Sequence, residues 1–346
     1  MTTYLRNAWY VAAQSSELTT TPLKRTLLEE RCALFRTESG EVAILLDRCP
    51  HRFAPLSCGK VRAEVLTCGY HGLAFDRSGQ CVANPHGPVP RAARVRSYPC
   101  FERYGYVWFW PGDPTKADPK ALPAFPYLED PTHFSVVKTY LHVKANYQLV
   151  VDNLLDLSHV PFLHPNFAVE GVSTQKDLGQ TMTRVKRESD RVLSRRVRSG
   201  LPPNKPAREI FGFGPEPVDM RSHMTWFPPA LLDFDLGTCL TGTSEAQGLC
   251  LPAAHYVTPE TELTCHYFVS AARNMRRDDP EVDRHIAGVM DTAFRLQDEP
   301  MIEAVQECMG PTGDLDSMQP LLLQTDGAPV EARRMLGSLI ATEQAG

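Results

Sequence analysis

The sequence predicts an α+β protein of two domains: an all-β unit at the N-terminus, followed by a larger unit of strands and helices. Three observations lead to this prediction. Short apolar runs separated by turn residues fill residues 1–115, and repeated prolines and acidic residues follow in residues 116–131. Residues 132–346 contain both strand-like runs and amphipathic helical runs. A chain of 346 residues is long enough for two domains of ordinary size.

Residues 1–115 carry the patterns of strands and hairpins. A short apolar run at 41–47 follows the turn residues Ser39 and Gly40, and an aromatic and β-branched run at 106–110 ends at Pro111. Residues 73–83 resemble a hairpin around Gly79. Loops beside such a rigid sheet are suited to hold a metal site in fixed geometry.

Two loops of this unit each supply one cysteine and one histidine. Cys49 and His51 are followed, after sixteen residues, by Cys68 and His71. Two thiolates and two imidazoles suit either zinc or a Rieske [2Fe–2S] cluster, in which two His replace two Cys on one iron. Zinc sites usually pair like ligands in sequence, whereas here each loop offers one of each. The spacing therefore favours the Rieske cluster, and a zinc-binding structural module is the alternative.

The second unit combines helical and strand patterns. Apolar residues at helical spacing predict helices over residues 147–158 and 280–305, and a further helix is expected over about 329–343. Strand-like runs on either side of residues 258–261 predict a hairpin within 249–270. Residues 170–222 are polar and are compatible with a mobile loop over a pocket. The apolar stripe of the 280–305 helix contains Val282, Ile286, Val289, Met290, Ala293, Phe294, Met301 and Val305.

A histidine pair follows the first of these helices. His159 and His164 are five residues apart, a separation that turns a regular helix by about 500°, so they share no helical face. Pro161 disturbs the helix between them, which lets His164 turn back towards His159.

A non-haem iron site with open positions needs two His and one carboxylate. Asp298 is the preferred carboxylate because it lies on the apolar face of the 280–305 helix, where a lone acid is costly unless it binds a metal. Asp291, at the edge of the stripe, is the competing candidate.

Two polar residues precede the histidines. Asp156 is three residues before His159 and shares its helical face, so its carboxylate is expected to accept a hydrogen bond from a metal-bound imidazole. The alternative is a solvated helix carboxylate. Asn153, six residues before His159, is expected either to hydrogen-bond in the iron site or to serve the helix.

The two ligand loops resemble a known family. Cys49-Pro-His-Arg-Phe-Ala-Pro-Leu and Cys68-Gly-Tyr-His-Gly-Leu-Ala-Phe-Asp are similar to the Rieske non-haem iron oxygenases, above all the oxygenase components of vanillate O-demethylase, dicamba O-demethylase and toluenesulfonate methyl-monooxygenase. The likeness runs from Arg6 to about Glu303, and Gly69 stands where the family usually has Pro. It implies a Rieske domain over 1–115, a Pro-rich connector over 116–131 and a mononuclear iron catalytic domain over 132–346. The catalytic domain would have a helix-grip, START-like fold, a large antiparallel sheet flanked by helices.

The resemblance also implies roles and partners. His159, His164 and Asp298 would bind mononuclear Fe(II), and Asp156 would link His159 to His71 of the next chain in a head-to-tail homotrimer. The chain lacks a convincing G-x-G-x-x-G or flavin-binding pattern, so electrons from NAD(P)H would come through a separate reductase with a flavin and an Fe–S centre.

The substrate implied by the resemblance is a small aromatic acid that is oxidised with O₂ at a methyl or methoxy group. His255 is a candidate for holding the anionic group. The candidate wall residues are Phe162, Phe167, Trp226, Phe227 and Tyr256. Two alternatives remain open: an aromatic-ring cis-dihydroxylating dioxygenase with the same metals, and a Rieske electron-transfer protein without catalysis.

Composition narrows the remaining possibilities. A net charge of −5 argues against a nucleic-acid partner, and no apolar run is long enough to span a membrane. The N-terminus has no charged-then-apolar signal, which favours a cytoplasmic protein in which the ten cysteines do not form a disulfide framework. Apart from the two cluster ligands, we expect these cysteines to be buried thiols.

Overall fold

The computed structural model describes residues 4–169 and 172–345. The chain divides into two compact units. Unit 1 comprises Met1–Pro123 together with Thr258–Thr261 and Thr342–Gly346, and unit 2 comprises Ala124–Val257 and Glu262–Ala341. The division at Pro123 falls inside the proline-rich segment 116–131.

The described residues of unit 1 form three small antiparallel sheets. Its core includes side chains from β3, β4 and β7 and the two cysteines Cys49 and Cys68, so the sheets pack directly behind the two predicted ligand loops. The predicted strands over 41–47 and 106–110 and the hairpin over 73–83 are confirmed. The sheets are β1-β10-β9, β2-β3-β4 and β5-β6-β7-β8. The strands are β1 (Tyr10–Gln14), β2 (Leu23–Leu27), β3 (Glu30–Arg36), β4 (Val42–Leu46), β5 (Lys60–Arg62), β6 (Val65–Thr67), β7 (Ala74–Phe75), β8 (Cys81–Ala83), β9 (Cys100–Arg103) and β10 (Tyr106–Phe109).

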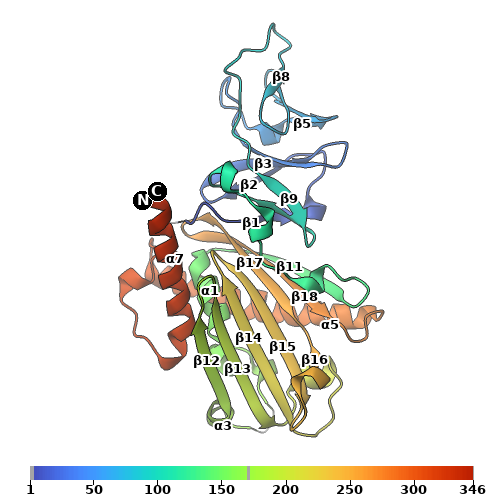
Figure 1. Ribbon diagram of the computed structural model, residues 1–346, viewed down its shortest axis with the longest axis vertical. Coiled ribbons are helices and arrows are strands. Elements are labelled where there is room, and N and C mark those ends of the chain that lie inside the picture. Colours follow the sequence, from blue (N-terminus) through green and yellow to red (C-terminus); the bar gives the residue numbers. More distant parts are fainter. Residues whose placement is uncertain (1–3, 170–171, 346) are drawn as a thin grey trace. The chain divides into compact units, whose positions relative to one another are not determined.

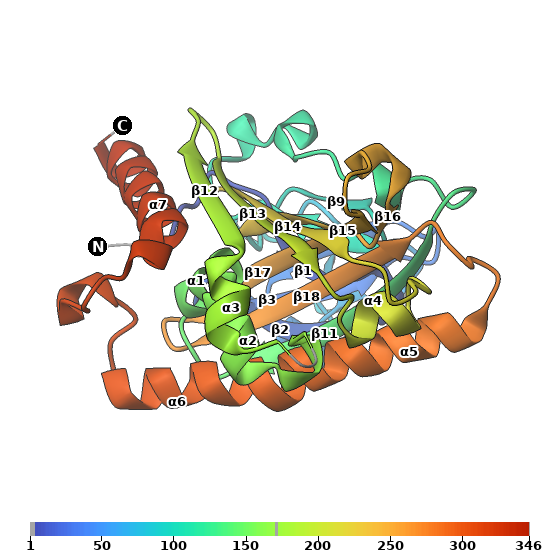
Figure 2. The same ribbon diagram turned by 90° about the horizontal axis from the view of Figure 1, so that it is seen from below.

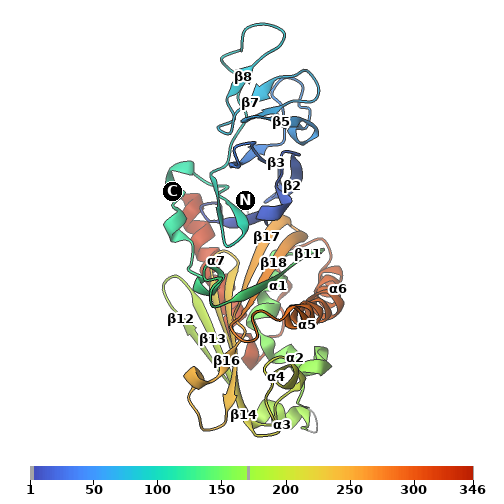
Figure 3. The ribbon, with the colours of Figure 1, turned by 90° about the vertical axis from the view of Figure 1, so that its right-hand side faces the viewer.

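Unit 2 is organised around an eight-stranded antiparallel sheet in the described part of the chain, with the order β11-β18-β17-β15-β14-β13-β12 and β16 paired to β15 (Figure 1). Helices α2 and α4 lie on the same side of the sheet as α5 and α6 (Figure 3). The expected large sheet flanked by helices is therefore confirmed. The strands are β11 (Ser135–Val143), β12 (Thr181–Arg187), β13 (Val192–Leu201), β14 (Val218–Phe227), β15 (Leu231–Leu240), β16 (Leu249–Cys250), β17 (Ala253–Thr261) and β18 (Thr264–Arg273).

The helices of unit 2 follow the predicted segments closely. The predicted helices over 147–158 and 329–343 correspond to α1 and α7, and the hairpin within 249–270 corresponds to β17 and β18. The polar segment 170–222 contains α3, β12, β13, α4 and the first part of β14, and its residues 170 and 171 lie outside the described residues. The helices are α1 (Tyr147–Leu155), α2 (Val160–Leu163), α3 (Thr174–Gly179), α4 (Lys205–Glu209), α5 (Pro280–Met290), α6 (Glu299–Met309) and α7 (Gly327–Ala345).

The predicted 280–305 helix is one continuous rod with an irregular centre (Figure 2). Between α5 and α6 the chain forms a π-helix, η9 (Asp291–Asp298), whose wider turn accommodates one extra residue. The buried positions along the rod are Val282, Ile286, Met290, Ala293, Asp298, Ile302 and Gln306. They are three or four residues apart except across η9, where the step is five. The predicted apolar stripe was therefore wrong at Met301 and Val305, which are exposed. The extra residue in the π turn shifts the buried positions that follow it by one residue along the sequence, to Ile302 and Gln306.

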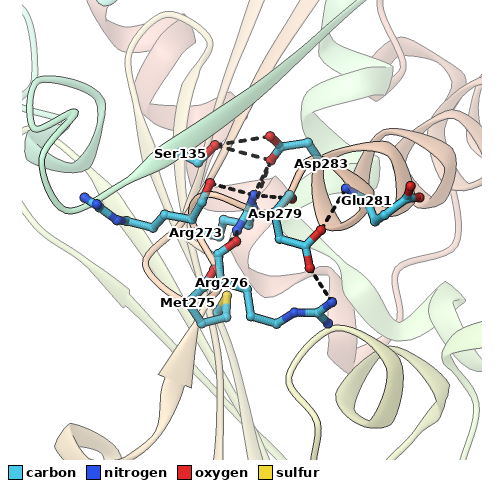
Figure 4. A network of polar contacts seen from close by, with 8 residues as sticks. Ser135, Arg273, Met275, Arg276, Asp279, Glu281 and Asp283 are labelled. Atoms are coloured by element: carbon cyan, nitrogen blue, oxygen red, sulfur yellow. Dashed lines mark hydrogen bonds and ion pairs between the residues drawn. The ribbon is translucent and has the colours of Figure 1, made fainter.

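Arg273, at the end of β18, anchors the start of this rod. Its guanidinium is fully buried and forms an ion pair with Asp283 of α5 at 2.8 Å. It also donates to the main-chain carbonyls of Met275, Arg277 and Asp279 (Figure 4). The Asp279 side chain caps α5 by accepting from the amide of Glu281. Each of the three guanidinium nitrogens of Arg273 therefore donates to at least one acceptor.

Within the residues that the structure describes, no helix is both long and apolar enough to cross a membrane.

Candidate active site

The two loops of unit 1 that carry Cys and His have the same local structure. In the first, the amide of Phe53 donates to the carbonyl of Cys49, and the amide of Cys49 donates to the carbonyl of Ala54. In the second, the amide of Gly72 donates to the carbonyl of Cys68, and the amide of Cys68 donates to Leu73. Phe53 and Gly72 both have positive φ, 60° and 75°. The two loops are therefore structural repeats that present their ligands in the same way.

The side chains of these loops separate by type. Cys49 and Cys68 are buried, and burial together with the neighbouring Cys68 thiol raises the pKa of Cys49. The rings of His51 and His71 lie side by side near the surface, with their centroids 4.5 Å apart. A pair of inner thiols and a pair of outer imidazoles is the donor set that a Rieske cluster requires, so these residues fit the group.

Two further observations concern the neighbourhood of the loops. Cys58 is exposed and forms no disulfide. At Gly69, a Cβ atom would lie 2.7 Å from the carbonyl oxygen of Cys58, so the second loop packs against residue 58 more closely than a side chain at this position allows.

A second constellation forms in unit 2 from two separate elements. His159 ends a short 3₁₀ turn (Leu157–His159) that follows α1, and His164 lies directly after α2. Asp298 is the last residue of η9. One ligand atom from each of these three residues lies within 4.8 Å of the others. The structure thus brings together the three residues expected to form a facial triad, and the carboxylate among them is Asp298.

The distances within this group suit a single metal ion. Nε2 of His159 and Nε2 of His164 lie 3.5 and 3.2 Å from Oδ1 of Asp298. His164 and Asp298 are buried, and His159 is half-buried. Burial lowers the pKa of His159; it also opposes protonation of His164, but the Asp298 carboxylate outweighs it and raises the pKa of that ring. Three converging donors in a largely buried site fit the two-His, one-carboxylate set of a non-haem iron.

Both imidazoles are held in the tautomer that metal binding needs. Nδ1 of His159 donates to the main-chain carbonyl of Asp156 at 2.8 Å, and Nδ1 of His164 donates to Oε1 of Gln297 at 2.7 Å. With the proton on Nδ1, Nε2 of each ring is bare and faces Asp298. The expected acceptor for His159 was the carboxylate of Asp156, but that group instead accepts from the amide and hydroxyl of Ser158. Sequence reasoning did not identify Gln297, although it directly precedes Asp298.

Asn153 reaches the same group from α1. Its side-chain amide donates to Oδ1 of Asp298 at 3.2 Å, so of the two expectations for this residue the structure places it in the site. The start of α1 is in turn tied to α6, since the amide of Asn146 donates to the buried side chain of Gln306. The helix that carries Asn153 and the helix that follows Asp298 therefore hold each other in place.

A largely apolar cavity of about 180 Å³ opens beside the triad. A cavity of about 150 Å³ lined by apolar side chains is large enough for a benzene ring, so this one has room for a single substituted ring. Its walls come from the inner face of the sheet, from α4 and the residues after it, and from the α5–η9 rod. Among the apolar lining residues are Phe167, Met220, Met224, Phe234, Leu236 and Phe294.

The predicted substrate-binding residue His255 lines the cavity. His255 lies in the wall with its Nδ1 2.7 Å from the hydroxyl of Tyr267, and its Nε2 is buried without a partner among the described residues. Burial lowers the pKa of His255 to about 3, so the ring is neutral at pH 7.

Of the five predicted aromatic wall residues, Phe167 lines the cavity, and Phe162 is exposed. The other three, Trp226, Phe227 and Tyr256, are absent from the lining. Tyr256 was a wrong choice because neighbouring residues of a strand face opposite sides, and His255 occupies the inner one.

Three charged residues of the cavity region were missed from the sequence. Arg196 and Arg198 of β13 line the cavity, and Asp177 of α3 forms a buried ion pair with Arg198 at 3.0 Å. A signal was present, since both arginines are in phase with the buried residues Val192 and Ser194 of the same strand. The overall polarity of residues 170–222, which is compatible with a mobile loop, conceals this alternation.

Comparisons with known proteins match both units of the chain. Residues 8–99 match the family model of the Rieske [2Fe-2S] domain, and residues 143–342 match that of the vanillate O-demethylase oxygenase C-terminal domain. The chain is 39% identical to the oxygenase component of dicamba O-demethylase from Stenotrophomonas maltophilia, covering 99% of this chain and 100% of that one. It is 31% identical to a vanillate O-demethylase oxygenase subunit from Pseudomonas sp. strain HR199, covering 98% and 96%.

Solved structures give the same result. The crystal structure of dicamba monooxygenase bound to 3,6-dichlorosalicylic acid superimposes with a TM-score of 0.92 at 36% identity, covering 99% of both chains. A second structure of dicamba monooxygenase, which contains non-haem iron and dicamba, has a TM-score of 0.84 at 36% identity and 99% coverage of each chain.

Proposed function

The chain belongs to the Rieske non-haem iron oxygenases of the vanillate O-demethylase type, and on that basis we propose that it is the terminal oxygenase component of a system that oxidises a methyl or methoxy group of a small aromatic acid. The observation that carries this proposal is the position of the triad, which is largely buried and borders a cavity sized for one aromatic ring. The enzyme is a Rieske non-haem iron monooxygenase that contains a [2Fe–2S] cluster and a mononuclear iron.

We assign the iron to His159, His164 and Asp298, and the cluster to Cys49, His51, Cys68 and His71. When bound, an iron in a two-His, one-carboxylate site keeps positions free for O₂ beside a substrate, and a Rieske cluster supplies single electrons. The residues around the triad prepare the site. Gln297 and the carbonyl of Asp156 hold the two imidazoles in the binding tautomer, and Asn153 fixes the carboxylate.

The cavity walls orient the substrate. Apolar side chains such as Phe234 and Phe294 exclude water and leave room for a flat ring. His255 supports the substrate through Nε2, which has no partner among the described residues. Nδ1 lies 2.7 Å from the Tyr267 hydroxyl, and we propose that this hydroxyl donates to Nδ1, which leaves the hydrogen of the neutral ring on Nε2. Replacing His255 by Ala should weaken substrate binding, and unchanged affinity would remove this assignment.

We further propose that copies of the chain assemble head to tail as a homotrimer, in which Asp156 connects His159 to His71 of a neighbouring copy. In unit 2, a cavity of about 290 Å³ beside Asp156 and His159 is lined by exposed apolar residues, among them Leu321, which is 89% exposed. In unit 1, Phe53 and Tyr70 are 63% and 61% exposed next to the Rieske ligands. Exposed apolar groups of this size usually mark contact surfaces, and their positions suit a contact between the two sites of different copies.

The assembly is tested by light scattering on the purified protein. A trimer is expected for the native chain, and Leu321→Glu or Phe53→Glu should dissociate it. Leu296→Glu is the matched control, because Leu296 is 63% exposed but does not line the cavity beside Asp156. A monomeric native protein would contradict the proposal.

The electrons must come from another protein. The relatives are named as oxygenase components, which supports a separate reductase. We propose that this partner uses NAD(P)H and contains a flavin and an Fe–S centre, as the family resemblance implies.

Product analysis tests the proposed activity. The enzyme, a reductase and NADH are supplied with methoxy-, methyl- and unsubstituted benzoates and benzenesulfonates under O₂. Formaldehyde with a phenolic product is expected from a methoxy substrate, and an alcohol from a methyl substrate, with Asp298→Ala inactive as the control. Products that gain two oxygens and two hydrogens would instead make the protein a ring dioxygenase, and cluster reduction without any product would make it an electron carrier.

A further inference from the structure

Arg196 is a buried cation in the wall of the cavity beside the triad. It lies on the inward face of β13 and is only 6% exposed. Its Nη2 is buried and has no hydrogen-bond partner, and the residue forms no ion pair with any residue that the structure describes. A buried guanidinium without an acceptor is costly, because the charge has lost its water and gained nothing in exchange.

The two other buried arginines of unit 2 show that this fold supplies partners when an arginine is structural. Arg273 is fully buried and is surrounded by Asp283 and several main-chain carbonyls (Figure 4). Arg198, two residues after Arg196 on the same face, is paired with Asp177 at 3.0 Å. Arg196 differs from both, since its Nη2 has no partner among the described residues. Its cross-strand neighbours, Thr183 and Ser222, carry no charge.

The charges around Arg196 do not balance. Asp177 is engaged by Arg198, and the more distant Asp156 carboxylate accepts from Ser158. Burial, reinforced by Arg198, lowers the pKa of Arg196 to about 10, so it keeps its proton at pH 7. His255 is neutral at that pH and adds no second charge. Asp298, the remaining carboxylate of the cavity wall, is assigned to the iron, so Arg196 is left without an acidic partner among the described residues. Nε2 of His255 likewise has no hydrogen-bond partner among them.

We propose that Arg196 binds the anionic group of the aromatic-acid substrate, and that this residue makes the cavity select an aromatic carboxylate or sulfonate over a neutral ring. The guanidinium presents two parallel N–H groups that match the paired oxygens of such a group. Arg196 and the triad line the same cavity, so a ring anchored at Arg196 can direct a substituent towards the iron site. This inference rests on the proposed function and adds to it the group that selects the substrate.

Binding under anaerobic conditions tests the inference without turnover. The holoenzyme is titrated calorimetrically with 2-, 3- and 4-methoxybenzoate, with the corresponding benzenesulfonates and with the neutral methoxybenzamides. The native protein is expected to prefer at least one anion over its amide. Arg196→Gln should weaken binding of that anion by roughly 10- to 100-fold, the loss expected for a charge-assisted hydrogen bond, and should leave the amide unchanged.

Arg195→Gln is the matched control. Arg195 is the preceding residue of β13 and faces the other side of the sheet, so the same substitution removes a charge from the same strand without touching the cavity. Binding of all probes by this variant should equal that of the native protein.

Thermal unfolding supplies an independent readout. Removing an uncompensated buried charge should leave the ligand-free Arg196→Gln protein as stable as the native one or more stable, and should abolish the stabilisation that the anion gives the native protein. A structural arginine would lower the unfolding temperature when replaced. The inference is overturned by lower stability of the free variant, by equal losses for anion and amide, or by failure of the native protein to bind any anion at millimolar concentration.

These outcomes are separate from those of product analysis. Anion binding that depends on Arg196, without any oxidised product, would remove the proposed function and keep the anion site. Formaldehyde release that is equally efficient in Arg196→Gln would keep the function and remove the anion site.

Discussion

Asp177→Asn should destabilise unit 2 strongly. Asp177 in α3 and Arg198 in β13 are both almost completely buried, and Nη1 of Arg198 lies 3.0 and 3.4 Å from the two carboxylate oxygens. Asp177 is also the only carboxylate that forms an ion pair with either cavity arginine among the described residues. Replacing it with a neutral amide leaves two neighbouring buried guanidinium groups with no ion-pair partner.

The size of the effect follows from the burial of the pair. Removing one partner of a buried ion pair typically costs about 3–5 kcal/mol, because the remaining charge stays desolvated. For a domain of 150–250 residues, each kcal/mol lowers the unfolding temperature by about 2–4 °C, so the expected shift is about 6–20 °C. The double variant Asp177→Leu with Arg198→Met should recover most of this loss, since an apolar pair of similar volume replaces the ions.

Scanning calorimetry is the appropriate assay, and the visible absorbance of the Rieske cluster identifies the transition of unit 1. Asp190→Asn is the matched control, because Asp190 pairs with Arg191 at the same distance of 3.0 Å but both side chains are exposed. Exposed pairs contribute little to stability, so this variant should unfold like the native protein. Equal unfolding temperatures for Asp177→Asn and Asp190→Asn would refute the argument from burial.

Three further outcomes are expected. His51→Ala should abolish the cluster absorbance, whereas Asp298→Ala should keep it and lose only the iron beyond the cluster's two, as measured by metal analysis and paramagnetic resonance; loss of both metal signals in either variant would contradict the assignment. Asp156→Asn should retain all iron but stop turnover, and an active variant would overturn its proposed role between subunits. His255 has a pKa of about 3 in the folded chain against 6.5 when unfolded, so below pH 6.5 the unfolded state binds the extra proton and stability falls as pH decreases. Between pH 7 and 5 the native protein should lose about 2 kcal/mol more than His255→Gln in denaturant titrations, at about 1.4 kcal/mol per pH unit, and parallel pH curves would contradict this.

The sequence pattern was sufficient to predict which side chains lie together at both candidate sites. The pairs Cys49–His51 and Cys68–His71 each lie within one short loop, so local sequence determines their geometry, and the structure shows the two loops to be repeats. Asp298 was distinguishable from Asp291 because it follows the apolar face of a long helix, and the structure places Asp298 beside the histidines.

Other features depend on information that is not local. Whether the carboxylate or the carbonyl of Asp156 accepts from His159 depends on the turn that starts at Asp156, where Ser158 competes for the carboxylate. The roles of Arg198 and Asp177 depend on the packing of α3 against β13, which brings together two residues that are twenty-one positions apart and leaves Arg196 without this partner. Helical periodicity cannot reveal a π turn, since the same residues also form an acceptable α-helical stripe.

The π-helix η9 makes chain length a more stringent constraint than residue identity in this part of the protein. Deleting one residue between Asp291 and Gln297 would allow a regular α-helix with better hydrogen bonding, yet it would rotate all that follows by about 100°. Either Asp298 would leave the histidines, or Ile302 and Gln306 would leave the core. Descendants of this chain can therefore exchange most side chains along η9, but a one-residue deletion there removes either the metal ligand or the packing behind it.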